Sequence, residues 1–258
     1  MRTLLLFVVL VAGASCMRGP IVVPGASDFV TPVVFEAADG VTLYGDLYLG
    51  PEGKAGPLIL AFHQGGGDAR GEYGTIAPRL VQLGYSVLAI DQRSGGDRLG
   101  GLNRTVEALG ESAPMCDAYL DLEATLRYVI GDGFTGLRVA WGSSYSASHV
   151  VRLATEYADD LDGVLAFSPA SGGPMADCHP NDRIPNVEIP LLALRPAAEM
   201  EIESAAAQLA LFQDSSHQTF VSTPGTHGAS MLNPDRVEGD VEATWAVVSR
   251  FLCTVLKP

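Results

Sequence analysis

The sequence is short of basic residues, and this shortage restricts the partners that the protein can have. Its 258 residues include 16 Lys and Arg against 30 Asp and Glu, which gives a formal net charge of −14 at pH 7. Nucleic acids attract basic surfaces, so we expect no nucleic-acid partner. The negative charge also disfavours strongly anionic substrates, although a local pocket can differ from the mean field. Apolar residues make up 47% of the chain, which is typical of a globular protein.

The chain also lacks an apolar run long enough to span a bilayer. Its most apolar stretch, residues 4–12, is much shorter than the roughly 20 residues that a membrane-spanning helix needs. This stretch follows the basic Arg2 and precedes small residues, a layout typical of a secretory signal peptide. We therefore expect residues 1–15 to be a signal peptide, residues 16–32 a flexible leader and residues 33–258 a single domain.

Two processing sites compete at this N-terminus. Residues 12–14, Ala-Gly-Ala, fit the small-x-small cleavage pattern of a freely secreted protein. Residues 13–16 resemble a bacterial lipobox that lacks the usual Leu, and Cys16 would then carry the lipid. Acyl chains add about 0.8 kcal/mol of membrane affinity per buried CH₂, so lipidation of Cys16 would tether the protein to a membrane. In both cases we expect an exported protein, either a lipoprotein of the bacterial cell envelope or a secreted or periplasmic one.

Cysteine is scarce, and the four that occur do not have the spacing of a zinc site. In an oxidising compartment they can form disulfides. Cys116 and Cys178 both fall in predicted loops, so we expect them to pair. Cys253 lies in an apolar helical pattern and is expected to pack as a small hydrophobic residue. The adjacent Cys178 and His179 are too few ligands for structural zinc, and we expect neither a metal nor an organic cofactor.

Alternating strand and helix patterns follow the leader. Two strands, 33–37 and 41–48, form a hairpin that turns at Asp39 and Gly40. Further strands are predicted at 58–62, 85–90, 137–141, 161–167, 189–194 and 219–222, and helices at 72–83, 114–130, 146–157, 202–212 and 237–255. Because helices separate successive strands, most strand pairs must be parallel. We expect an α/β fold with a mostly parallel central sheet, helices on both faces and an antiparallel N-terminal edge.

The stretch with chemical content lies at residues 137–147, where a predicted strand is followed by a turn and a helix. Residues 142–146 read Gly-Ser-Ser-Tyr-Ser, which fits the nucleophile-elbow pattern G-x-S-x-G except that serine replaces the second glycine. Small residues flank the nucleophile in such a turn because the strand and the helix crowd it. The spacing from Gly142 favours Ser144 as the nucleophile over Ser143. Helix capping by these serines is the alternative interpretation.

The elbow and its surroundings resemble the α/β-hydrolase fold, in particular its dienelactone-hydrolase-like branch. The resemblance covers most of residues 33–255. Beside the elbow it rests on His-Gln-Gly-Gly-Gly at 63–67, on residues 88–95, on Pro-Leu-Leu-Ala-Leu at 190–194 and on Gly-Thr-His-Gly at 225–228. It implies a serine hydrolase that cleaves carboxylic esters through an acyl-enzyme.

The resemblance also implies that a base and an acid follow the nucleophile along the chain. His227 follows a short predicted strand and precedes a glycine, as the catalytic His of the family does, so it is the expected base. His217 precedes that strand and is expected at the surface. His149 lies on the helix after the elbow and is expected to be a packed or capping residue. His63 begins the oxyanion loop and is expected to be structural.

The acid is expected on the loop after the strand at 189–194. The Asp position of the family falls on Glu199, and a Glu, which reaches one methylene further, can serve there. Glu201 is the alternative acid. A third possibility is that Glu199, Glu201 and Glu203 are solvated residues favoured by the dipole of the following helix.

The oxyanion hole of such an enzyme needs two backbone N–H groups. The resemblance implies one at Tyr145, directly after the nucleophile, and another in the turn formed by Gln64 and Gly65. The glycines in this turn allow the backbone to approach a substrate closely. Asp91 and Arg93, at the end of a strand, resemble a charged pair of the family, and we expect an ion pair or turn contacts there.

Three functions remain compatible with these residues. The resemblance favours hydrolysis of small-molecule carboxylic esters. An exported peptidase or amidase on the same fold is the second, and a non-catalytic envelope binding protein the third, because fold does not dictate function. The pocket is expected between the loops at 94–113 and 168–187, on the carboxyl side of the sheet, where the expected disulfide would tie the loops together. No feature of the sequence indicates an oligomeric state.

Overall fold

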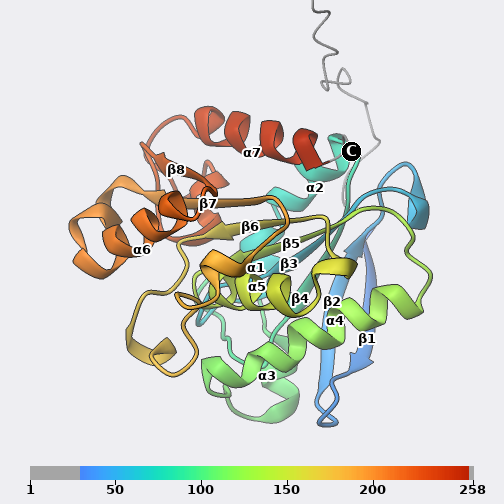
Figure 1. Ribbon diagram of the computed structural model, residues 1–258. Coiled ribbons are helices and arrows are strands. Elements are labelled where there is room, and N and C mark those ends of the chain that lie inside the picture. Colours follow the sequence, from blue (N-terminus) through green and yellow to red (C-terminus); the bar gives the residue numbers. More distant parts are fainter. Residues whose placement is uncertain (1–29, 256–258) are drawn as a thin grey trace, which may run out of the picture.

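A mixed sheet of eight strands forms the centre of the molecule (Figure 1). The computed structural model describes residues 30–255, so the expected signal peptide, its processing sites and Cys16 lie outside the described residues. The strands are β1 (Val30–Glu36), β2 (Thr42–Tyr48), β3 (Leu58–Phe62), β4 (Ser86–Asp91), β5 (Arg138–Ser143), β6 (Gly163–Phe167), β7 (Leu191–Pro196) and β8 (Gln218–Ser222). Their order across the sheet is β1-β2-β4-β3-β5-β6-β7-β8.

The first two strands form the antiparallel edge, and the strands from β4 to β8 are parallel to one another. The hairpin between β1 and β2 turns where Gly40 adopts a φ of 84° and donates its N–H to Ala37 O. β1 begins at Val30, which pairs with Tyr48, so residues 30–32 belong to the strand and not to the expected leader. Pro32 is tolerated there because β1 is an edge strand that need not donate every ladder hydrogen bond.

Helices cover both faces of the sheet (Figure 1). One face packs against α1 (Ala69–Tyr73), α2 (Ile76–Gln82) and α7 (Glu242–Val255), and the other against α4 (Tyr119–Gly131), α5 (Tyr145–Glu156) and α6 (Glu203–Asp214). Because successive side chains of a strand point to opposite faces of the sheet, the core is divided into two clusters. Val87 and Ala89 of β4 belong to one cluster, and Leu88 and Ile90 belong to the other. The expected α/β architecture, with a mostly parallel sheet and an antiparallel edge, is confirmed.

One predicted helix is divided in the structure, and one helix of the structure was not predicted. The helix expected at 72–83 is split into α1 and α2, because Pro78 has no N–H and its ring would clash with the carbonyl of Gly74 in a continuous helix. An additional helix, α3 (Arg104–Leu109), follows Asn103, whose side chain accepts a hydrogen bond from Val106 N–H. Only Thr105 of α3 is buried, so the sequence has no apolar period there to reveal a helix.

Short 3₁₀ helices occupy several connections. They are η2 (Gly53–Ala55), η3 (Met115–Ala118), η4 (Ala158–Asp160), η5 (Gly173–Met175), η6 (Ile184–Asn186), η7 (Ala197–Glu201) and η8 (Gly228–Leu232). The segments η3, η5, η7 and η8 all follow carboxyl ends of strands or lead back from them, so they surround the edge of the sheet where the elbow lies.

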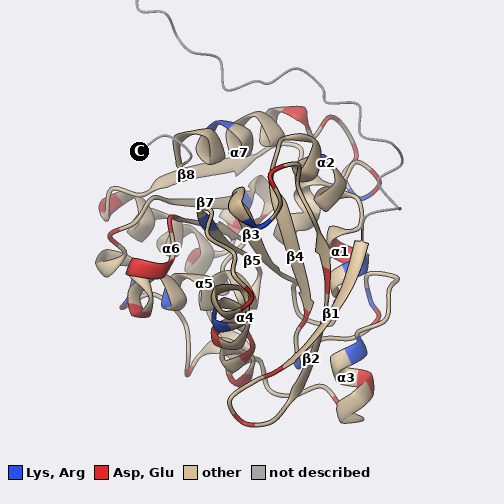
Figure 2. Cartoon of the chain, turned by 90° about the vertical axis from the view of Figure 1, so that its right-hand side faces the viewer, with Lys and Arg blue, Asp and Glu red and all other residues tan. Residues whose placement is uncertain are grey.

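The basic residues are spread over several elements instead of forming one patch in the view of Figure 2. Within residues 30–255, no helix combines the length and the apolar character needed to cross a membrane.

Cys116 and Cys178 are joined by a disulfide, with their Cα atoms 5.8 Å apart and a sequence separation of 62. This bond connects η3 to the segment that follows η5. Cys253, which the sequence predicts to pack as a small hydrophobic residue, belongs to α7. It is only half-buried, between buried Leu252 and exposed Thr254 in the last turn of α7, and its side chain is therefore near the surface.

Candidate active site

Ser144 lies in the sharp turn between β5 and α5. Its backbone has φ 61° and ψ −118°, a combination that residues with a side chain rarely adopt and that costs conformational energy. Its N–H donates to Phe167 O of β6 at 2.8 Å, which fixes the turn to the neighbouring strand. Ser144 is half-buried, whereas Ser143 and Tyr145 on either side are buried. The strained turn therefore presents the Ser144 side chain at the carboxyl end of the sheet.

Gly142 and Ser146 show how the sequence produces this turn. A Cβ atom on Gly142 would lie 2.4 Å from the backbone oxygen of Ser146, so only glycine fits there. The Ser146 hydroxyl, which replaces the second glycine of the pattern, donates to Phe62 O at 2.7 Å and accepts from Ser143 N–H at 2.8 Å. The buried hydroxyl is thus satisfied, and it connects the elbow to β3.

Ser143, the alternative nucleophile, is fully buried. Its Oγ donates to Glu72 Oε1 at 2.7 Å and accepts from Ala229 N–H at 2.9 Å. A hydroxyl that is enclosed and hydrogen-bonded on both sides cannot reach a substrate. Of the two serines, Ser144 is therefore the accessible one.

His227 and Glu199 are paired. His227 Nδ1 lies 2.6 Å from Glu199 Oε1, and the side chain of Glu199 is 12% exposed against 47% for His227. Burial raises the pKa of Glu199, but the hydrogen bond to His227 and the charges of His227 and Arg195 outweigh it, so the pKa lies below its ordinary value. Glu199 therefore stays ionised. Glu201 and Glu203, the other carboxylates of this loop, are exposed, and in the described part of the chain neither is hydrogen-bonded to His227.

The loop after His227 packs against the elbow. Gly228 N–H donates to Ser168 Oγ at 3.1 Å, and Ala229 N–H to Ser143 Oγ. Gly228 has a φ of 71°, and a Cβ atom there would lie 2.3 Å from Ser143 Oγ, so the close approach requires glycine. These contacts bring the His227 loop to the residue next to Ser144. Between residues 30 and 255, no hydrogen bond joins the Ser144 hydroxyl to the imidazole directly.

In the turn after β3, the N–H group of one of the two expected oxyanion donors already has a partner. Gln64 N–H donates to Glu72 Oε2 at 2.7 Å, so the expectation that Gln64 offers its N–H to a substrate is wrong. Gly65 and Tyr145 remain as candidate oxyanion donors. A Cβ atom on Gly65 would lie 3.7 Å from the Tyr145 ring, which places the two residues side by side, and Tyr145 begins α5, where an N–H has no partner within the helix.

Glu72 is a functional candidate that the sequence did not reveal. Its carboxylate is 1% exposed and accepts hydrogen bonds from the backbone and side chain of Gln64 and from Ser143 Oγ. It therefore joins the oxyanion turn to the elbow. The sequence predicted only a helix that includes Glu72, and nothing in its pattern indicates which segments the side chain meets.

Arg195 is a second such residue. It lies in β7, is 3% exposed, and donates from Nη1 to Glu199 Oε2 at 2.6 Å. From Nη2 it donates to Pro169 O and to Gln208 Oε1. A possible sequence signal was an arginine directly after an apolar strand and four residues before the expected acid.

The other histidines do not join the pair. His63 is fully buried, with Nδ1 against Gln64 O and Nε2 accepting from Gln92 N–H, which fits a structural role. His149 is buried on α5 with Nε2 against Met115 O. His217 is half-buried rather than a free surface residue, because its Nε2 lies 2.8 Å from Ile184 O.

Asp91 and Arg93 are not paired with each other. Asp91 binds the Arg104 side chain at 2.5 Å and accepts from Ala69 N–H. Arg93 binds the carboxylates of Asp121 and Asp39. Each residue fixes a different part of the loop after β4, as expected for bracing contacts.

The two expected pocket loops both reach the elbow helix. Tyr145 Oη donates to Ser94 O of the first loop, and Ser148 Oγ to Ala170 O of the second. Met115 and Met175 pack with Tyr145 in a small apolar cluster, directly beside the Cys116–Cys178 disulfide.

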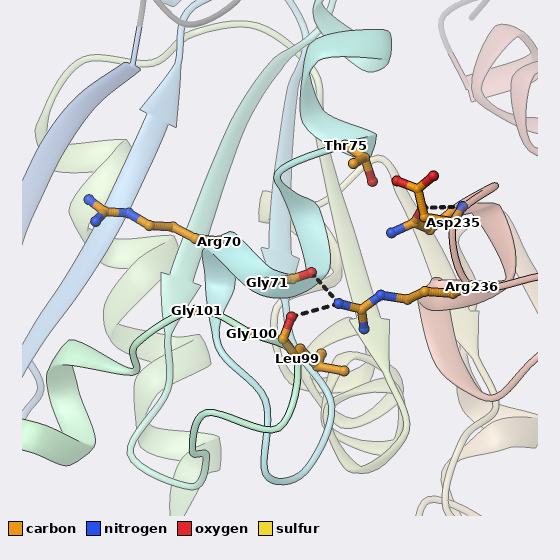
Figure 3. Close-up of a pocket in the computed structure, with 9 residues that line it drawn as sticks. Arg70, Gly71, Thr75, Leu99, Gly100, Gly101, Asp235 and Arg236 are labelled. Atoms are coloured by element: carbon orange, nitrogen blue, oxygen red, sulfur yellow. Dashed lines mark hydrogen bonds between the residues drawn. The ribbon is translucent and has the colours of Figure 1, made fainter.

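A separate pocket of ≈ 390 Å³ lies between α1, the loop at 99–101 and the segment at 233–236 (Figure 3). None of the candidate catalytic residues lines it. Arg236 already donates to the backbone oxygens of Gly71 and Leu99, and the Arg70 side chain extends away toward Asp46. In the described range of residues, no three His, Cys, Asp or Glu side chains are grouped so that they could hold a metal ion.

Comparisons with known proteins bear on the fold. No family model and no curated protein sequence matches the chain. Solved structures do: an esterase of Pyrococcus furiosus has a TM-score of 0.67 at 15% identity, covering 88% of this chain and 91% of that one. A dienelactone hydrolase of Anabaena variabilis has a TM-score of 0.63 at 16% identity, covering 87% and 97%. An acylaminoacyl peptidase of Pyrococcus horikoshii has a TM-score of 0.61 at 14% identity, covering 86% of this chain but 41% of that one.

At these identities the likeness concerns the fold rather than the activity. The strand order, the antiparallel edge and the helices on both faces agree with these neighbours. The chain therefore has the α/β-hydrolase fold.

Proposed function

We propose that this protein is a serine hydrolase that cleaves small-molecule carboxylic esters through an acyl-enzyme. Ser144 is the nucleophile, His227 the general base and Glu199 the acid that orients it. The observation that carries the proposal is the His227–Glu199 pair. The loop that follows His227 packs against a strained turn with an accessible serine. Neighbours in fold that are described as an esterase and a dienelactone hydrolase support it.

In the first half of the reaction, Ser144 Oγ attacks the acyl carbon and its proton passes to His227 Nε2. The ionised Glu199 accepts the hydrogen bond from Nδ1 and stabilises the imidazolium that forms. The N–H groups of Gly65 and Tyr145 donate to the oxyanion of the tetrahedral intermediate. The imidazolium then returns its proton to the leaving alcohol oxygen, and the acyl-enzyme is formed.

In the second half, a water molecule attacks the acyl-enzyme while His227 takes its proton. The tetrahedral intermediate collapses, the ester bond to Ser144 Oγ breaks, and the serine oxygen recovers its proton from the imidazolium. The serine and the imidazole need to come into contact only when substrate is bound, since catalytic hydrogen bonds are often long in free enzymes.

A fluorophosphonate probe and a p-nitrophenyl ester test the proposal. We expect the probe to label the wild-type protein but not Ser144→Ala or His227→Ala, and kcat of Ser144→Ala to fall roughly 10⁴-fold or more. Ser204→Ala, at an exposed position of α6, is the matched control and should label normally. Near-normal ester turnover in Ser144→Ala would refute the proposal.

Amide hydrolysis is the second candidate, because one neighbour in fold is described as an acylaminoacyl peptidase. The same residues would serve an amide. A panel of p-nitrophenyl esters and peptide anilides separates the two candidates, and we expect kcat/KM to be higher for the esters. A protein that the fluorophosphonate does not label and that hydrolyses neither class of substrate would favour the non-catalytic binding protein.

We also propose that the protein acts outside the cytoplasm. The Cys116–Cys178 disulfide supports this, because disulfides persist in oxidising compartments and are rare in the cytosol. Intact mass measurement of the mature protein tests both processing sites: loss of the N-terminal residues indicates cleavage, and an added acyl mass that Cys16→Ser removes indicates a lipoprotein. A mature protein that retains Met1 would contradict export through this signal.

A further inference from the structure

The two oxygens of the Glu199 carboxylate have different partners. Oε1 lies 2.6 Å from His227 Nδ1, and Oε2 accepts from Arg195 Nη1 at 2.6 Å. The carboxylate therefore lies between a buried cation on one side and the imidazole on the other. A carboxylate held at both oxygens has little freedom to rotate about its terminal bond.

Arg195 is itself held by neighbours from two other segments. Its Nη2 donates to Pro169 O, in the loop after β6, and to Gln208 Oε1 of α6. Gln208 is in turn fixed, because its Nε2 donates to Asn181 Oδ1 at 2.8 Å and to Ala170 O at 3.0 Å. The guanidinium thus has a fixed position relative to the loop at 168–187.

The burial of Arg195 is costly. Its side chain is 3% exposed, and in the part of the chain that the structure describes its Nε atom is buried without a hydrogen-bond partner. Burial lowers the pKa of Arg195 even though the charge of Glu199 acts in the opposite direction. A buried ion pair with an unsatisfied donor is weak support for stability, so its retention calls for another role.

The length of the Glu199 side chain indicates what that role is, namely to restrict the orientation of the carboxylate. Glutamate has one more rotatable bond than aspartate, so its carboxylate has more conformations to lose when it is oriented toward an imidazole. Glu199 also lies in a short 3₁₀ helix whose first residues are exposed, so the backbone gives its side chain little packing support. A fixed guanidinium at Oε2 restricts the carboxylate to the orientation in which Oε1 faces His227.

We infer that Arg195 is a positioning residue of this active site, acting on His227 only through Glu199. This inference rests on the proposed function, since it assigns a role within the same set of residues. Its consequence is that the loss of Arg195 lowers kcat more than it raises KM, because Arg195 is only 3% exposed and acts through Glu199.

A double-mutant cycle separates this role from a general structural one. The four proteins are the wild type, Arg195→Met, Glu199→Ala and the double variant, each measured with a p-nitrophenyl ester. We expect Arg195→Met alone to lower kcat about 10- to 100-fold, with KM changed less than about twofold. Such a loss is typical when a catalytic group is displaced slightly from its productive position. In the Glu199→Ala background the same change should alter kcat less than about twofold.

Equal losses of kcat in the two backgrounds would overturn the inference, because a structural defect does not depend on Glu199. An unchanged kcat in folded Arg195→Met would overturn it as well. Thermal unfolding shows whether each variant is folded. If Arg195→Met is not, Gln208→Met takes its place in the cycle: it removes a support of the guanidinium without leaving the carboxylate unpaired, and its effect on kcat should again vanish in the Glu199→Ala background.

The outcome is distinguishable from failure of the proposed function. If the fluorophosphonate does not label Ser144 in the wild-type protein, the proposed function fails. If it labels Ser144 and the cycle shows independent effects of Arg195 and Glu199, only the positioning role of Arg195 fails.

Discussion

Ser143 Oγ donates a hydrogen bond of 2.7 Å to Glu72 Oε1, so the residue before the proposed nucleophile is tied to a helix 71 residues earlier in the chain. The other oxygen of Glu72 accepts from Gln64 N–H at 2.7 Å, at the start of the oxyanion turn. One buried carboxylate therefore sets the position of the elbow relative to the turn that holds Gly65, a proposed oxyanion donor.

Replacement of Glu72 by Gln tests this connection. The three groups that contact the Glu72 carboxylate, the backbone N–H and side-chain amide of Gln64 and the Ser143 hydroxyl, all donate hydrogen bonds to it. The NH₂ group of a Gln at this position would therefore face a donor and leave it unpaired. We expect the free energy of unfolding to fall by about 1–3 kcal/mol, and kcat to fall as well, since the oxyanion turn loses its fixed position. Urea denaturation and ester turnover measure the two effects.

Glu107→Gln, at an exposed position of α3, is the control for Glu72→Gln, and it should leave both quantities unchanged. If Glu72→Gln has the stability and the kcat of the wild type, the buried carboxylate does not connect the two segments in the way argued above.

The close packing around Gly142 leads to a prediction about the elbow itself. A Cβ atom there would lie 2.4 Å from a backbone oxygen of α5, and neither the strand nor the helix can move without disturbing the sheet. Gly142→Ala should therefore destabilise the protein by about 3 kcal/mol or more and remove probe labelling at Ser144. Gly172→Ala, where a Cβ atom would meet nothing within 4 Å, should do neither. A folded, fully reactive Gly142→Ala protein would contradict the crowding argument.

The elbow could be predicted from the sequence because its requirements are local. Gly142 and the serines follow an apolar strand and precede a helical pattern, and steric crowding in such a turn permits only small residues. The division of the chain into strands and helices was predictable for the same reason, since burial on both faces makes the parallel strands continuously apolar.

What could not be predicted depends on side chains that meet across the fold. Glu72 and Gln64 lie within one predicted strand–helix unit, yet only the packed structure shows that the carboxylate occupies the N–H expected to face the substrate. Arg195 likewise looks like any arginine at the end of a strand until Glu199 is placed beside it. Cys253 is only half-buried instead of fully packed, because an apolar helical pattern does not indicate which residues reach the surface in the last turn.

The Cys116–Cys178 disulfide should contribute strongly to stability. It joins two residues with a sequence separation of 62, and a cross-link of this kind restricts the unfolded chain, with a typical effect of about 2–4 kcal/mol. We expect Cys116→Ser combined with Cys178→Ser to lose stability in this range in urea denaturation. The double variant is preferable to added reductant, because the substitutions change only these two cysteines.

The same double variant should also have a lower kcat/KM. Met115, next to Cys116, packs against the oxyanion turn: a Cβ atom on Gly65 would lie 2.7 Å from its methyl carbon. Release of η3 would loosen that contact. A variant with lower stability but unchanged kcat/KM would show that the disulfide holds the loops without affecting the site.

The burial of His149 leads to a prediction of how the stability of the protein changes with pH. It is fully buried on α5 between the rings of Tyr119 and Tyr145, and burial lowers the pKa of His149 to about 4, although the hydrogen bond to Met115 O favours the charged form. In the unfolded chain the imidazole takes up a proton near its ordinary pKa of 6.5. Because the pKa is depressed in the folded state, stability is complete above about pH 6.5 and is lost as the pH falls toward 4.

The size of this loss follows from the shift of the pKa, and it amounts to about 3 kcal/mol between these two pH values for a fully buried group. Other groups titrate in the same range, so the measurement must be a difference. We expect the free energy of unfolding of the wild type to fall more steeply between pH 6.5 and pH 4 than that of His149→Gln, which keeps a donor for Met115 O but cannot be protonated in the unfolded chain. Urea denaturation at a series of pH values measures both curves. Parallel curves would mean that His149 is protonated in the folded protein, which would require water or a carboxylate at its buried Nδ1 atom, and the described residues place neither a donor nor an acceptor there.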